Sequence, residues 1–274
     1  MINFEILRYL KCKWIRILLV ICLLFVTAAF SVQNVYRFLI MSELLTAYDL
    51  FTISDYIVGT FNSAQFMMYF ILPVLFSILV ADIISADLDE NLDQFFFTRL
   101  DNRLSYVFVK IKMIILFAIV FTILFLAVLL ITGSFYHISF TTNHHHYLFL
   151  ANQRHHVWVY LYVASFFILG LILIGMIVVT LSIYLKNAGV SVGIIVLLGF
   201  MHNIFYVIGF DGVLAWLPFS QYLFGHRNYF MPFGLDVPYF TTLFSLMYMI
   251  GGSGILSILM TKKIRNMDIG LGKE

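Results

Sequence analysis

Charge is scarce in this chain. Only 11% of its 274 residues are charged, whereas 62% are hydrophobic, and the mean hydropathy is +1.00. Soluble domains carry about 25% charged residues, and a packed globule of this length cannot bury so much apolar surface. The scarcity therefore excludes an ordinary soluble protein and indicates a chain whose solvent is the lipid bilayer.

Cysteine and nucleotide-binding motifs are also scarce or missing. Cys12 and Cys22 are the only cysteines, and their positions suit neither a structural disulfide nor a structural zinc site. No G-x-x-x-x-G-K-[ST] sequence occurs, so the chain has no P-loop. Its polar connections are too short to hold a nucleotide-binding domain, and any ATPase activity is expected on another chain.

Long apolar runs make up most of what is present. A helix needs about 20 apolar residues to cross a bilayer, and continuous runs favour helices over the alternating pattern of a β-barrel. Arg16, near the start of the first run, is expected to extend toward the lipid headgroups. The sequence predicts an all-α integral membrane protein whose single transmembrane domain has spans at about 15–33, 62–84, 111–133, 157–185, 190–210 and 237–260.

Basic residues predict the orientation of these spans. Thirteen of the 16 Lys and Arg residues fall in the N-terminal segment, the 85–112 loop, the 186–189 turn and the C-terminal tail. By the positive-inside rule both termini face the cytosol, in a multi-pass plasma-membrane protein. The abundance of Phe, Ile and Leu hints at a Gram-positive bacterium. A cleaved signal peptide ending near Ala29 is the alternative for the first span, but five further spans argue against it.

Residues 1–14 have an amphipathic pattern. Leu7, Leu10 and Trp14 share one helical face, and Arg8 and Lys11 lie on another. This pattern predicts an elbow helix that lies in the headgroup plane before the first span. The alternative is a basic flank that only fixes the topology.

The connection between spans two and three carries the most organised charge. Asp87 and Glu90 have the spacing of a capping box, and acids suit a helix N-terminus. Leu88, Leu92, Phe95 and Phe96 then share a helical face, opposite Asp89, Glu90 and Asp93. Arg99 and Arg103 follow in a polar turn. The pattern predicts a short cytosolic coupling helix that docks onto a partner; the alternative is a solvated loop whose apolar residues rest on the bilayer.

This connection resembles that of the membrane subunits of ABC-2 type transporters. The resemblance rests on Asp87, Leu88, Glu90, Leu92, Arg99, Arg103, Tyr106 and Lys110. Many members have Gly-Thr in this segment, where this chain has Asn91-Leu92. The turn at 182–189 and the proline-containing stretch at 214–222 also resemble the family's cytosolic turn and re-entrant segment.

The resemblance implies a function for the chain. It would be a permease subunit that is not itself an enzyme and that pairs with a second permease subunit and a separate cytosolic ABC ATPase. ATP and Mg²⁺ would bind to the ATPase, with no cofactor on this chain and no nucleic acid as partner. Asp87, Leu88, Glu90, Leu92, Phe95, Phe96, Arg99 and Arg103 would form the ATPase-coupling site. The scarcity of charge in the spans favours an amphiphilic substrate, such as a lipid, a hydrophobic peptide or an antimicrobial compound.

Two other functions are open. The chain could be a membrane sensor or immunity protein that binds a toxin without transport. It could also bind a metal through an outer loop containing His144, His146, His155 and His156, because histidine is the commonest metal ligand. Three consecutive histidines cannot all face one ion, and a plain polar loop is the alternative. The 134–156 loop has no Asp or Glu, which argues against hydrolytic chemistry.

Two features lie within the spans. His202 and Asn203 are polar residues at membrane depth, where such residues line a substrate pathway or bond neighbouring helices. Gly251, Gly252 and Gly254 in the last span predict close helix packing.

Overall fold

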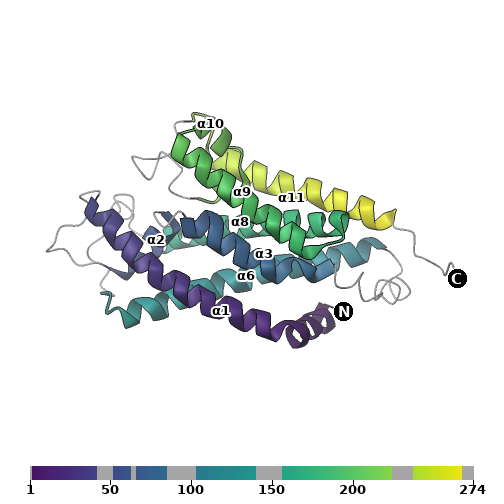
Figure 1. Cartoon of the computed structure of the whole chain (residues 1–274), viewed down its shortest axis with the longest axis horizontal. Helices are drawn as coiled ribbons and strands as arrows, with labels where there is room; N and C mark the ends of the chain where they lie inside the picture. The colour runs from purple at the N-terminus through teal and green to yellow at the C-terminus, as the bar shows by residue number, and fades with distance from the viewer. Residues whose placement is uncertain are drawn as a thin grey trace.

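The computed structural model describes residues 2–41, 52–62, 66–84, 103–139, 156–223 and 237–266. These residues are helical apart from short turns and one isolated bridge between Thr52 and Ser139. The helices are α1 (Ile2–Met41), α2 (Ile53–Asn62), η1 (Met67–Ile71), α3 (Leu72–Val80), α6 (Arg103–Phe135), α8 (His156–Leu185), α9 (Ala188–Ile208), α10 (Asp211–Leu214), η2 (Pro218–Gln221) and α11 (Thr242–Arg265). Figure 1 shows the long helices as one elongated bundle.

Among the described residues, six helical stretches are long and apolar enough to cross a membrane, and each overlaps one of the predicted spans. The prediction of an all-helical chain with six candidate membrane spans is therefore confirmed for this part of the chain. The stretches are Lys13–Arg37, Met67–Ile84, Leu104–Phe135, Val159–Leu185, Ala188–Ile208 and Thr242–Arg265.

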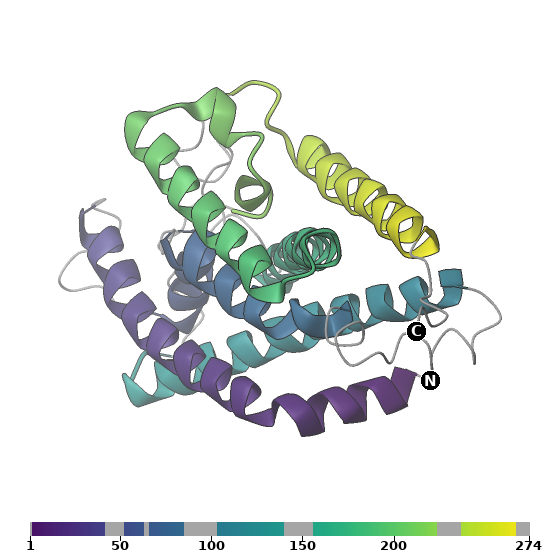
Figure 2. The same ribbon diagram turned by 45° about the vertical axis from the view of Figure 1, so that its right-hand side comes forward.

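The bundle has two distinct ends. α1 begins and α11 ends at the same end of the molecule (Figure 1), which we call the termini end. The opposite end carries α2, and we call it the α2 end. In Figure 2, α8 is seen nearly along its axis with the other long helices around it, and it contacts α2, α3, α6, α9 and α11. α8 is thus the central helix, whereas α11 and α9 lie at the edge with few of their residues buried.

Aromatic side chains fill the centre of the bundle. The ring of Phe61 packs edge-on against the rings of Phe125 and Phe167, with centroids 5.8 and 5.3 Å apart. Phe76 contacts Phe121 in the same way at 5.5 Å. Because lipid tails are as apolar as these side chains, such helices associate by close packing rather than by escape from water.

α1 is continuous through the residues predicted to form the elbow. No helix break separates residues 2–14 from the first span, so a separate elbow helix is not confirmed. The axis of α1 nevertheless changes direction in its first turns (Figure 2). The amphipathic segment is thus the angled start of a 40-residue helix.

α2 begins with a capping box. The backbone N–H of Asp55 donates to Thr52 Oγ1 (3.2 Å), and the backbone N–H of Thr52 donates to Asp55 Oδ2 (3.4 Å). This reciprocal pair satisfies two helix-terminal donors. The backbone N–H of Ile53 also donates to the carbonyl of Ser139 (2.8 Å), which attaches the start of α2 to the end of α6.

Candidate functional site

A polar cluster lies inside the bundle, formed by Tyr69, His202 and Asn203. We call it the intramembrane polar cluster. The Tyr69 hydroxyl donates to Asn203 Oδ1 at 2.5 Å, and the rings of Tyr69 and His202 lie 4.5 Å apart. His202 is fully buried. The structure therefore brings the two residues predicted for a substrate pathway together with a tyrosine from another span.

A π-helical turn positions Tyr69. η1 covers Met67–Ile71 at the start of the second span, and π-helical turns occur frequently at functional sites. The turn lies close to α9, because a Cβ at Gly199 would be 2.7 Å from Cδ2 of Phe70. Gly199 thus permits the approach that places Tyr69 against His202 and Asn203.

The segment after α9 covers the cluster. Phe219 of η2 is fully buried, and its ring packs edge-on against His202 at 5.9 Å. The segment is fixed in place because Gln221 Nε2 donates to the carbonyl of Ala215 (2.7 Å) and the Tyr222 hydroxyl donates to the carbonyl of Met68 (2.8 Å). The side chains of Phe219, Ser220 and Gln221 are buried, so this segment packs within the protein.

The cluster offers a hydroxyl donor, an amide and an imidazole in apolar surroundings. Polar side chains at this depth suit recognition of a polar group or bonding between helices. The rings of Tyr69 and Phe219 that pack against His202 belong to the short elements η1 and η2.

A cluster of charges joins α1 to the end of the second span. Asp82 accepts from Lys13 Nζ at 2.9 Å and from Arg16 Nη1 at 2.7 Å. Arg16 was expected to extend toward the headgroups. The structure adds that its guanidinium pairs with Asp82 and that its side chain is 33% exposed. Hydrogen bonds between two charged groups, as here, are among the strong ones in proteins.

Tyr9 extends this contact by one turn. Its hydroxyl donates to the carbonyl of Leu79, and its ring lies 5.0 Å from that of Phe117. Burial raises the pKa of the Tyr9 hydroxyl well above its ordinary value, so it remains a neutral donor. Tyr9, Lys13, Arg16 and Asp82 form what we call the termini-end cluster, which joins α1 to α3.

The start of α6 is anchored at the same end. Lys110 is 1% exposed, and its Nζ lies 5.2 Å from the centroid of the Tyr106 ring. Tyr106 is buried as well. The sequence predicted membrane re-entry at Lys110; the structure adds that its side chain lies inside the bundle. In the sequence, the 85–102 segment is therefore preceded by the buried Ile84 and followed by the buried Tyr106 and Lys110.

Most of the predicted site residues lie outside the part of the chain that the structure describes. These are Asp87, Leu88, Glu90, Leu92, Phe95, Phe96 and Arg99 of the coupling segment, and His144, His146 and His155 of the outer loop. Arg103 and His156 are the first residues of α6 and α8. Within the described ranges, no group of three or more His, Cys, Asp or Glu side chains could hold a metal ion.

Several partners in these clusters, among them Tyr69 and Asp82, were not predicted from the sequence. Tyr69 gave no signal, because it is one of 16 tyrosines in an aromatic-rich chain. The pairing of Arg16 with Asp82 could have been found, since they are opposite charges that each border a long apolar run.

Comparisons with known proteins give a family but no activity. A family model described as "Protein of unknown function (DUF2705)" matches residues 16–270. Neither a curated protein nor a solved structure matches the chain.

Proposed function

The chain belongs to the DUF2705 family of proteins of unknown function, and we propose that it is the membrane-spanning permease subunit of an ATP-driven exporter of the ABC-2 type. A separate cytosolic ABC ATPase docks on residues 87–103. A second permease subunit completes the membrane part. The substrate is an amphiphile such as a hydrophobic peptide, a lipid or an antimicrobial compound.

The anchoring of the 85–102 segment carries this proposal. On one side Asp82 is joined to Lys13 and Arg16, and on the other Lys110 is buried. Each end of this segment is thus next to residues that pack within the bundle. Among the described residues, the termini end also carries Lys112, Lys186, Lys262, Lys263 and Arg265, which supports a cytosolic location for this end.

The proposed mechanism follows from these connections. ATP closes the ATPase dimer, and the docked 87–97 helix moves with it. Asp82 passes the displacement to α1 through Arg16, and the buried start of α6 passes it to the third span. The relative movement of these helices opens or closes the path in the membrane.

Substitutions on the apolar face of the coupling segment test the docking. Leu92→Asp and Phe95→Asp are expected to abolish co-purification of the ATPase without affecting membrane insertion, because each places a charge in an apolar contact. Asp93→Asn, on the opposite face, is the matched control and is expected to retain the ATPase. The measurement is the ratio of ATPase to permease after purification from the native host in mild detergent.

Two outcomes would redirect the assignment. Normal ATPase recovery from both aspartate variants would contradict docking through this face. If the unaltered protein yields no ATPase even after crosslinking at residues 87–103, the exporter proposal fails and the sensor or immunity function takes its place.

Within this proposal the intramembrane polar cluster lines the substrate path. His202→Ala and Asn203→Leu are expected to lower export, or the resistance that export confers, while protein abundance and ATPase recovery stay unchanged. Unchanged export in both variants would instead assign the cluster to helix packing.

A further inference from the structure

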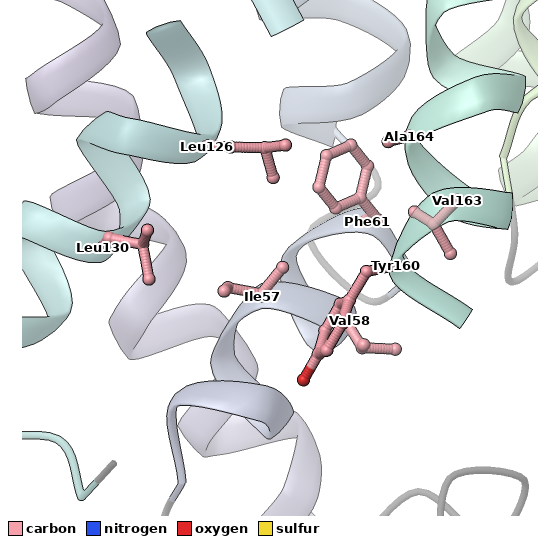
Figure 3. A pocket seen from close by; sticks show the side chains of 8 residues that line it. All are labelled: Ile57, Val58, Phe61, Leu126, Leu130, Tyr160, Val163 and Ala164. Carbon is pink, nitrogen blue, oxygen red and sulfur yellow. The ribbon is translucent and has the colours of Figure 1, made fainter. Parts of the chain in front are cut away.

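An apolar cavity of about 180 Å³ lies at the α2 end of the bundle, outside the two clusters described above. Figure 3 shows its lining: side chains of α6 on one side, side chains of α8 on the other, and side chains of α2 between them. The lining residues are Ile57, Val58, Phe61, Leu126, Leu130, Tyr160, Val163 and Ala164.

The α2 wall of the cavity is fixed by hydrogen bonds to α1. The Tyr56 hydroxyl donates to the carbonyl of Ala28 (2.7 Å), and Thr60 Oγ1 donates to Ser31 Oγ (3.1 Å). At its start, α2 touches α6 closely, since a Cβ at Gly133 would be 2.5 Å from Cδ1 of Ile53. These contacts hold α2 in place beside the cavity.

The chemistry of the cavity favours hydrocarbon over water. Its inner wall is the ring of Phe61, which is held by Phe125 and Phe167. The hydroxyl of Tyr160, at the edge, is already hydrogen-bonded to the side chain of Ser54. Water needs two to four polar partners to occupy a cavity, whereas apolar cavities of about 150 Å³ stay dry and accept hydrocarbon guests.

The cavity opens on an exposed apolar part of the bundle. Leu130 at its edge is 43% exposed, and the nearby Leu161 is 51% exposed, both within spans long enough to cross the membrane. We propose that the cavity binds the end of one acyl chain of a membrane phospholipid, which enters sideways from the bilayer. This site is independent of the proposed export function.

Native mass spectrometry of the protein, purified in mild detergent with its copurifying phospholipid, tests the site. The unaltered chain is expected to retain one phospholipid. Ala164→Phe and Val163→Phe are expected to lose it, because each adds a side chain that fills the space. Leu161→Phe, on the same helix but facing outward, is the matched control and is expected to retain it.

A second measurement locates the lipid and guards against misfolding. A phospholipid with a diazirine at the end of its chain, in phosphatidylglycerol vesicles, is expected to label peptides containing residues 57–61, 126–130 or 160–164. Ala164→Leu, a smaller change, is expected to reduce that labelling at an unaltered melting temperature. Equal labelling in Ala164→Leu and the unaltered chain, or labelling concentrated at the smaller cavity beside Leu24 and Phe121, would overturn the proposal.

Discussion

Single side chains at the two clusters connect spans that are distant in the sequence. Asp82 is 66 residues from Arg16, and Tyr69 is 134 residues from Asn203. The two residues of each pair make a short polar contact, and their surroundings supply few other hydrogen-bond partners. Removing one residue therefore leaves the polar group of the other with too few hydrogen bonds.

Asp82→Asn is predicted to destabilise the protein, because it leaves two cations facing an uncharged amide. Hydrogen bonds to charged groups contribute about 1.5 to 3 kcal/mol, and partial exposure of all three side chains places the expected loss at the lower end of that range. The free energy of unfolding is to be measured by SDS titration in mixed micelles.

Arg16→Gln provides the second arm of a double-mutant cycle with Asp82→Asn. The two losses are expected to be less than additive, because both remove the same contact. Strict additivity would show that the ion pair makes no energetic contribution and would weaken the anchoring on which the proposed coupling depends.

At the level of elements, the central helix and the edge helix differ in how tightly they are packed. In α8, a Cβ at Gly170 would be 2.6 Å from Cγ of Tyr222. In α11, a Cβ at Gly251 or Gly254 would meet no atom within 4 Å among the described residues. The small residues of the last span were predicted to permit close packing; within the described part of this chain, Gly252 alone of the three approaches a neighbour, with Leu173 at 3.1 Å. The reason is that α11 lies at the edge of the bundle.

The same substitution is therefore predicted to act differently on these two helices. Gly170→Ala is expected to cost about 1 to 3 kcal/mol, because the added methyl group meets a fixed ring. Gly254→Ala is expected to be neutral or to stabilise by up to about 1 kcal/mol, because alanine has the higher helix propensity and meets open space. Thermal melting of both variants in one detergent checks the contrast, and a stable Gly170→Ala would refute the close packing of Tyr222 on α8.

For the whole molecule, the distribution of basic residues predicts the orientation in the membrane. With Cys12 and Cys22 replaced, single cysteines at Tyr136→Cys and Asn266→Cys place exposed reporters at the α2 end and the termini end. A membrane-impermeant maleimide added to intact cells is expected to label position 136 and to spare position 266 until the cells are opened. The reverse pattern would put the coupling segment outside the cell and exclude a cytosolic ATPase partner.

The sequence by itself determined the number, order and approximate limits of the spans. An apolar run such as 157–185 favours lipid over water whatever helices surround it. The structure has a candidate membrane-spanning helix at Val159–Leu185. The same is true of the charge asymmetry between the ends, because each Lys or Arg acts through its position in the chain.

Tertiary structure alone decided which residues meet. The pairing of Arg16 with Asp82, the approach of Tyr69 to Asn203, and the cavity between α2, α6 and α8 all depend on how helices cross. The residues that meet at each of these places lie tens of residues apart in the sequence, and no local sequence pattern connects them. The π-helical turn at Met67–Ile71 is of the same kind, since that apolar run suits an ordinary α-helix equally well. The preference of apolar runs for lipid therefore determines where the spans lie, and the packing of the helices determines which residues of those spans come into contact.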